Sequence, residues 1–87
     1  MEKRIQFLRV FLYHFLNLDE VTPNFPTFFI NYMESNYSLE ERKEILSSLT
    51  WALNQKDLNF PDLLRGITIS NVQIKLEIEK VLQLAQP

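Results

Sequence analysis

The chain has 87 residues, of which 46% are hydrophobic and 13% are aromatic, and its formal net charge is −2. This length is enough for one domain and too short for two, and the apolar share is enough to build a core. One glycine and four prolines are too few turn residues for a β-sandwich, and the apolar content argues against a disordered segment.

The chain contains no cysteine. This excludes disulfides, thiolate nucleophiles and cysteine-ligated zinc sites, and it is typical of a reducing compartment. The N-terminal run "MEKRIQFLRVFLYHFLNLDE" begins with basic residues like a signal peptide, but Arg9, His14 and Asn17 interrupt it. No small-residue cleavage site follows, and the run is too short and too polar to span a bilayer. We therefore expect a cytoplasmic protein with no membrane partner.

Charge is unevenly distributed along the chain. Residues 19–62 carry eight acids against three bases, whereas the segments on either side carry a small positive excess. Binding to phosphates needs clustered Lys and Arg, so the acidic middle disfavours nucleic acid as a partner. It suits a basic protein partner, although an ordinary solvated helical surface has the same composition.

The first predicted helix spans residues 2–18. Its apolar residues recur every three or four positions, which is the period of an amphipathic helix. They cover about half of the circumference, and a stripe that wide is typical of a central helix with neighbours on two sides. The stripe consists of Ile5, Phe7, Leu8, Phe11, Leu12, Phe15, Leu16 and Leu18.

The segment "LDEVTPNFP" breaks this helix, because each proline restricts the residue before it. A second helix is predicted from about Phe25 to about Asn36, with Pro26 in its first turn. Its aromatic face carries Phe25, Phe28, Phe29, Tyr32 and Met33.

A third helix is predicted from Ser38 to about Gln55. Ser38 and Glu41 form a capping box, in which the serine oxygen accepts from a free amide while the glutamate reaches back. The "NFPDLLRG" segment after it predicts a short helical turn that ends at Gly66. The core-facing positions of the third helix are Ile45, Leu46, Leu49, Ala52 and Leu53.

The last segment supports two interpretations. "VQIKLEIEKV" alternates apolar and polar residues, which is a strand signal. However, Ser70 and Gln73 offer a second capping box, and Leu, Glu, Lys and Gln favour a helix. No other predicted strand could pair with it, so we predict a helix over residues 72–82. The fold class is then all-α, a compact four- to five-helix bundle forming a single domain over residues 1–87.

No group of residues indicates catalysis or ligand binding. His14 is the single histidine and has no companion ligands, so we expect a polar residue on a helix surface and no metal site. Gly66 is the single glycine, which excludes a glycine-rich phosphate loop and the nucleotide cofactors that such loops hold. We therefore expect no cofactor and no enzymatic activity.

Trp51 lies off the apolar stripe of the third helix. On a helical wheel it forms one line with Glu44, Ser48 and Gln55, and Glu40 lies beside that line. An aromatic residue with a charged rim is typical of an interface anchor. The other interpretation is that the indole covers the "DLNFPDLL" segment, and both remain open.

The stretch from "FPTFFINYMESN" through "LSSLTWALNQKDLNFPDLL" resembles the small all-helical immunity proteins of contact-dependent growth inhibition and other bacterial polymorphic toxin systems. The resemblance covers about half of the chain and is one of character, without an aligned binding residue. It implies an inhibitor that binds a cognate toxin, such as a basic nuclease, and blocks its active site or substrate surface.

Our leading hypothesis is therefore a non-enzymatic, toxin-neutralising protein. The alternative is a homodimeric helical adaptor or regulatory module, such as a phage-encoded inhibitor, with the stripe of the first helix and the aromatic second helix as the subunit interface. The residues predicted to contact a partner are Glu40, Glu44, Ser48, Trp51, Gln55, Asp57, Asp19 and Glu20.

Overall fold

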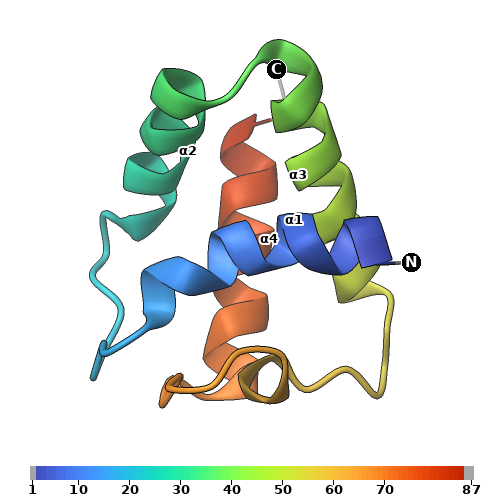
Figure 1. Ribbon diagram of the computed structural model, residues 1–87. Coiled ribbons are helices and arrows are strands. Elements are labelled where there is room, and N and C mark those ends of the chain that lie inside the picture. The colour runs from blue at the N-terminus through green and yellow to red at the C-terminus, as the bar shows by residue number, and fades with distance from the viewer. Residues whose placement is uncertain (1, 86–87) are drawn as a thin grey trace.

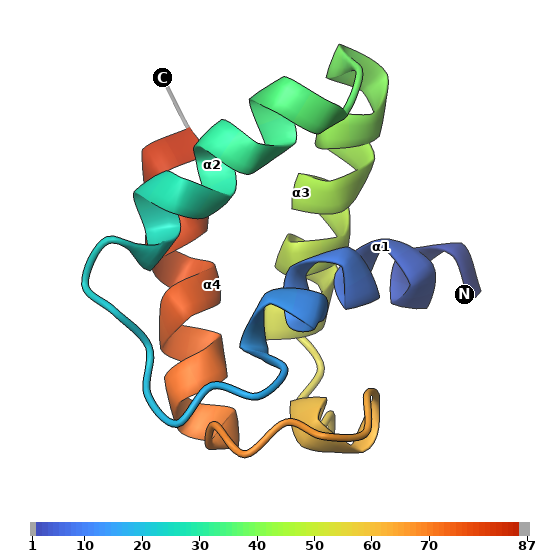
Figure 2. The same cartoon turned by 60° about the vertical axis from the view of Figure 1, so that its left-hand side comes forward.

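A computed structural model of the chain describes residues 2–85 and shows an all-α bundle (Figure 1). Its α-helices are α1 (Glu2–Leu12), α2 (Phe25–Asn36), α3 (Leu39–Leu53) and α4 (Asn71–Ala85), and the 3₁₀ helices are η1 (Tyr13–Phe15) and η2 (Phe60–Asp62). Helices α2 and α3 lie on either side of α4, and α1 crosses the bundle against α3 (Figures 1 and 2). The predicted all-α bundle is confirmed. None of the helices in residues 2–85 combines the length and the apolar character that a membrane span requires.

Local capping signals position the starts of α3 and α4. The Glu41 amide donates to Ser38 Oγ at 3.2 Å, and the Ser38 amide donates to Glu41 Oε1 at 2.9 Å, so the predicted capping box is confirmed. At α4 the Gln73 amide donates to Ser70 Oγ. The Gln73 side chain, however, donates to Glu77 instead of reaching back to the cap. The ambiguous last segment is helical, as predicted.

The first helix is shorter than predicted. The prediction extends it to residue 18, but α1 ends at Leu12 and continues only as the 3₁₀ turn of η1. Leu16 then takes an extended conformation and pairs with Ile67 in an isolated antiparallel bridge. Asn17 follows with φ at 63°, a left-handed conformation that asparagine tolerates better than most residues. A contact with a distant segment therefore ends the helix where the local apolar pattern would continue it.

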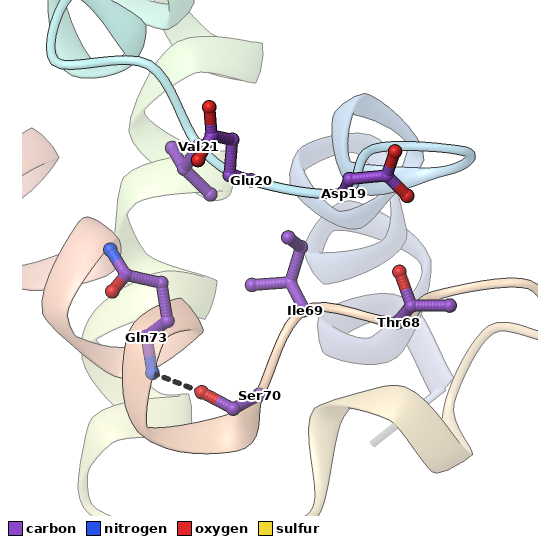
Figure 3. Close-up of a pocket in the computed structure, with 7 residues that line it drawn as sticks. All are labelled: Asp19, Glu20, Val21, Thr68, Ile69, Ser70 and Gln73. Atoms are coloured by element: carbon purple, nitrogen blue, oxygen red, sulfur yellow. Dashed lines mark hydrogen bonds between the residues drawn. The ribbon is translucent and has the colours of Figure 1, made fainter.

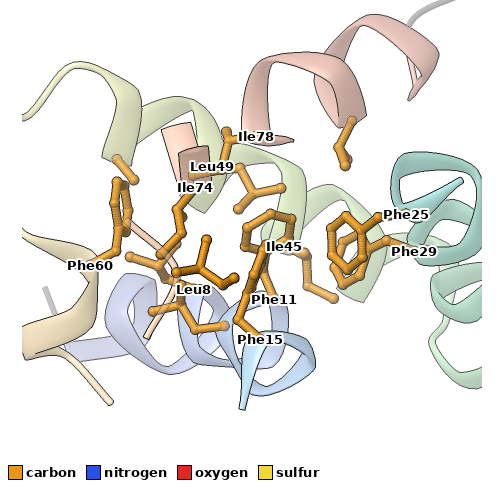
Figure 4. Close-up of a cluster of buried hydrophobic side chains, with 14 of the residues drawn as sticks. Leu8, Phe11, Phe15, Phe25, Phe29, Ile45, Leu49, Phe60, Ile74 and Ile78 are labelled. Carbon is orange, nitrogen blue, oxygen red and sulfur yellow. The ribbon is translucent and has the colours of Figure 1, made fainter. Parts of the chain in front are cut away.

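The core is one apolar cluster to which all four helices contribute (Figure 4). Phe11 occupies its centre, with its ring centroid 5.6 Å from that of Phe25 and 5.0 Å from that of Phe29. The exception on the aromatic face of α2 is Phe28, whose side chain is exposed. The buried apolar residues are Leu8, Phe11, Leu12, Phe15, Phe25, Phe29, Met33, Ile45, Leu49, Ala52, Phe60, Ile69, Ile74, Ile78 and Val81.

This core uses the surfaces that the dimer alternative requires. The stripe of α1 and the aromatic face of α2 supply buried residues such as Phe11 and Phe29, so they pack inside one chain. Phe28 remains exposed on the aromatic face of α2, so a dimer interface there would use Phe28 and its accessible neighbours. The dimer alternative stays a prediction.

The same substitution at two positions of α3 tests the placement of the core. Leu49 is fully buried, whereas Leu39 in the first turn is 60% exposed. We expect Leu49→Ala to lower the free energy of unfolding by about 2–5 kcal/mol because it leaves a cavity. Leu39→Ala should change it by about 0.5 kcal/mol or less. Urea denaturation followed by circular dichroism measures both, and equal effects would contradict this core.

Candidate binding surface

Trp51 is half-buried and packs against the core from the side of α3 that faces α1. The guanidinium carbon of Arg4, on α1, lies 5.6 Å from the centroid of the indole ring. A cation over an aromatic face is attracted by the ring quadrupole. The residue covering the indole therefore comes from α1, which the sequence does not indicate, and only part of the ring is accessible to a partner.

This position makes Trp51 important for stability. Truncation to alanine removes packing and the contact with Arg4, so we expect Trp51→Ala to cost about 1–3 kcal/mol of unfolding free energy. Phe28→Ala is the matched control, because Phe28 is an aromatic residue that is 53% exposed. It should cost less than about 1 kcal/mol. Circular dichroism during urea titration measures both variants, and a Trp51→Ala variant as stable as the wild type would contradict this placement.

The neighbours of Trp51 on the predicted line bond within their own helix. Ser48 is 2% exposed, and its hydroxyl donates to the Glu44 carbonyl oxygen at 2.9 Å. The side-chain amide of Gln55 donates to the Trp51 carbonyl oxygen at 3.3 Å. Ser48 thus lies beneath the surface, and Gln55 helps to complete the end of the helix.

The acids of this region remain exposed. Glu40, Glu44 and Asp57 all have accessible side chains, and the one ion pair among the side chains of residues 3–85 joins Lys80 to Glu77. Glu40 and Glu44 are four residues apart and share a helix face. We call Glu40, Glu44 and the accessible part of Trp51 the acidic flank of α3. Asp57 follows the far end of this helix, about 20 Å along the axis from Glu40.

Asp19 and Glu20 lie elsewhere. They belong to the loop between η1 and α2, on the opposite side of the molecule from α3 (Figures 1 and 2). Figure 3 shows them on the loop side of a hollow of about 390 Å³, with Thr68, Ser70 and Gln73 on the other side. The structure therefore divides the predicted contact residues between two surfaces. Within residues 2–85, no three acidic or histidine side chains gather closely enough to hold a metal ion.

One acid that the sequence does not distinguish is buried. Glu77 on α4 is 2% exposed. Its Oε2 accepts from the Gln73 side chain at 2.6 Å and lies 3.6 Å from Lys80 Nζ, while Oε1 has no hydrogen-bond partner among residues 2–85. A buried carboxylate is tolerated only with such partners. Glu77 lies four residues after Gln73 and three before Lys80, so the sequence pattern alone predicts that its side chain is exposed to solvent.

His14 is not the exposed helix-surface residue that we expected. It lies in η1, half-buried, with its ring centroid 4.5 Å from that of Tyr32, 5.3 Å from that of Phe29 and 5.6 Å from that of Phe28. Burial among these rings lowers the pKa of His14. The early end of α1 places it there, because the η1 turn directs its side chain towards α2.

The lowered pKa of His14 gives a pH dependence with a definite sign. In the unfolded chain His14 binds a proton near pH 6.5, whereas in the folded chain it is protonated only at a lower pH. The folded state is therefore favoured above pH 6.5, and this contribution is lost as the pH falls below it. We expect the wild type to lose more unfolding free energy than His14→Gln between pH 7.5 and 5.5, measured by urea denaturation. Parallel losses would contradict the burial of His14.

A third surface lies between the C-terminal half of α2, the first two turns of α3 and the last turn of α4. It is a hollow of about 320 Å³, which we call the α2–α3 groove, and its lining includes the exposed side chains of Leu39 and Leu84. One signal for it is present in the sequence. Leu39 and Leu46 are seven residues apart on one helix face, with Arg42 and Lys43 between them.

No protein-family model matches this sequence, and neither the curated proteins nor the solved structures contain a match to it. Functional inference therefore depends on the surfaces. Of the predicted contact residues, Glu40 and Glu44 are the pair that the structure keeps both exposed and adjacent on a rigid helix.

Proposed function

We propose that this chain is a non-enzymatic inhibitor that binds a basic protein partner, in the manner of a toxin-neutralising immunity protein. The observation that carries the proposal is the acidic flank of α3. There, Glu40 and Glu44 are exposed and have no cation paired with them among residues 2–85. Their charge is available to a partner.

Electrostatics explains how such a surface would inhibit. Exposed carboxylates attract a basic surface over a distance, and this steering raises the association rate at low salt. A nuclease has a basic surface because its substrate is a polyanion. A row of carboxylates bound there would exclude the phosphates of that substrate.

The fold supports rigid presentation of these carboxylates. The opposite side of α3 is fixed by Ile45, Leu49 and Ala52, which are fully buried. A binding helix that is already ordered loses little conformational entropy on association. The accessible part of Trp51 adds apolar contact at the edge of the charged row.

A charge-reversal experiment tests this function. The partner to use is the product of the reading frame next to the gene for this chain, produced in a bacterial host. We expect it to arrest growth, and we expect co-expression of the wild-type chain to restore growth. Glu40→Lys combined with Glu44→Lys should lower the association rate of the purified proteins at least about tenfold at low salt.

The matched control is Glu79→Lys, which makes the same change at an exposed acid of α4. It should restore growth as the wild type does, and all variants should keep the same circular dichroism. Because Glu40 lies in the first turn of α3, the double variant should lose up to about 1 kcal/mol of unfolding free energy. Trp51 is left unchanged because its substitution affects folding. A neighbouring product that does not arrest growth would contradict the function, and full rescue by the double variant would contradict the site.

A further inference from the structure

The α2–α3 groove is the largely apolar hollow at the end of the molecule where α2 and α3 are joined. These helices contact each other little beyond their connection, while both pack on α4 (Figures 1 and 2). Ile30, Met33 and Leu46 line its inner part, and Leu39 and Leu84 lie exposed at its edge. Its volume of about 320 Å³ lies at the lower end of the range of about 300–1,000 Å³ for ligand sites.

Two large apolar side chains at this edge are exposed. Leu39 is 60% and Leu84 is 56% accessible, and they come from different helices and line the same hollow. Scattered exposed leucines are normal in a soluble protein, whereas these two share one concave site with a largely apolar lining. The centre of the groove therefore suits an apolar side chain.

The charges around the groove indicate what flanks that side chain. Arg42 and Lys43 line it from α3, and neither forms an ion pair with the side chains of residues 3–85. The Nε of Arg42 is buried and donates to no acceptor among these residues. A partner's carboxylate can therefore reach only the terminal nitrogens of this guanidinium, with which it can form a charge-assisted hydrogen bond. Glu34 on α2 also lines the groove and is its one negatively charged side chain within residues 3–85.

From this complementarity we propose that the α2–α3 groove binds an acidic segment of another protein, with one large apolar side chain in the hollow and a carboxylate on Arg42. Lys43 adds a second, more exposed cation for such a segment. This site lies on the other side of α3 from the acidic flank and binds a partner of opposite charge. It is independent of the proposed inhibitory function.

The test uses a fluorescein-labelled peptide, Asp-Asp-Leu-Phe-Asp-Asp, with the full chain. Fluorescence anisotropy gives its affinity, and ¹H–¹⁵N correlation spectra locate its site. We expect shifts confined to the groove and at least about tenfold weaker binding to the Arg42→Glu, Lys43→Glu double variant. Glu34→Gln should tighten binding about two- to threefold, because it removes an exposed like charge. A gain of affinity cannot result from misfolding.

Matched controls separate the contribution of charge from that of apolar contact. Lys56→Glu changes the sign of an exposed cation in the loop after α3, and Val72→Ser removes an exposed apolar side chain from α4. Both should bind the peptide like the wild type, whereas Leu39→Ser should bind it at least about threefold more weakly.

Several results would overturn the proposal. Equal binding of a Lys-Lys-Leu-Phe-Lys-Lys peptide would show that the charge of the partner is irrelevant. Shifts outside the groove would place the site elsewhere. If Arg42 only stabilises the packing of α3 against the end of α4, the double variant should have a lower Tm and an unchanged affinity for the peptide. Concentration-dependent dimerisation that Leu39→Ser abolishes would assign the groove to a second copy of this chain.

Discussion

The contact between Phe11 and the rings of α2 is the interaction on which the rest of this structure depends. The backbones of α1 and α2 approach each other closely at few points, and aromatic side chains bridge the distance between them. Phe11 reaches both Phe25 and Phe29, and smaller side chains there would leave a cavity. The aromatic volume thus sets where α2 lies. From this position α2 packs along α4 and contacts α3 little.

Local signals in the sequence were sufficient for α2 and α3, whereas for α4 the local pattern also fitted a strand. Pro26, the Ser38–Glu41 capping box and the apolar spacing of α3 each act within a few residues, so they predict element ends closely. The end of α1 depends on contacts that no local pattern contains. Leu16 pairs with Ile67, and the loop after it is held by a hydrogen bond from a threonine 50 residues away. Tertiary contacts override helix propensity here.

The same limit applies to the candidate site. A helical wheel predicts that Glu40 and Glu44 share a face, and it is correct because that relation lies within one helix. It cannot predict that Ser48 is buried, or that α1 packs against α3 and places Arg4 over Trp51. Nor can it assign a loop to one side of the bundle, so it could not predict that Asp19 and Glu20 lie far from α3. Periodicity shows which residues share a face, whereas the packing of other helices determines which of them are accessible.

Helix α3 therefore presents two different surfaces from one rigid support. Its acidic flank lies beside α1, and its other flank carries Leu39 and Arg42 into the groove. The core face between them is fully buried, so a partner on one flank has little means of reshaping the other. The remaining coupling between the two surfaces is electrostatic. At physiological salt a screening length of about 8 Å weakens the interaction between charges on the two surfaces. At low salt that length reaches about 30 Å, and an acidic segment in the groove then strengthens the attraction of the acidic flank for a basic partner. Coupling between the two sites should therefore disappear with added salt, whereas a conformational mechanism would persist.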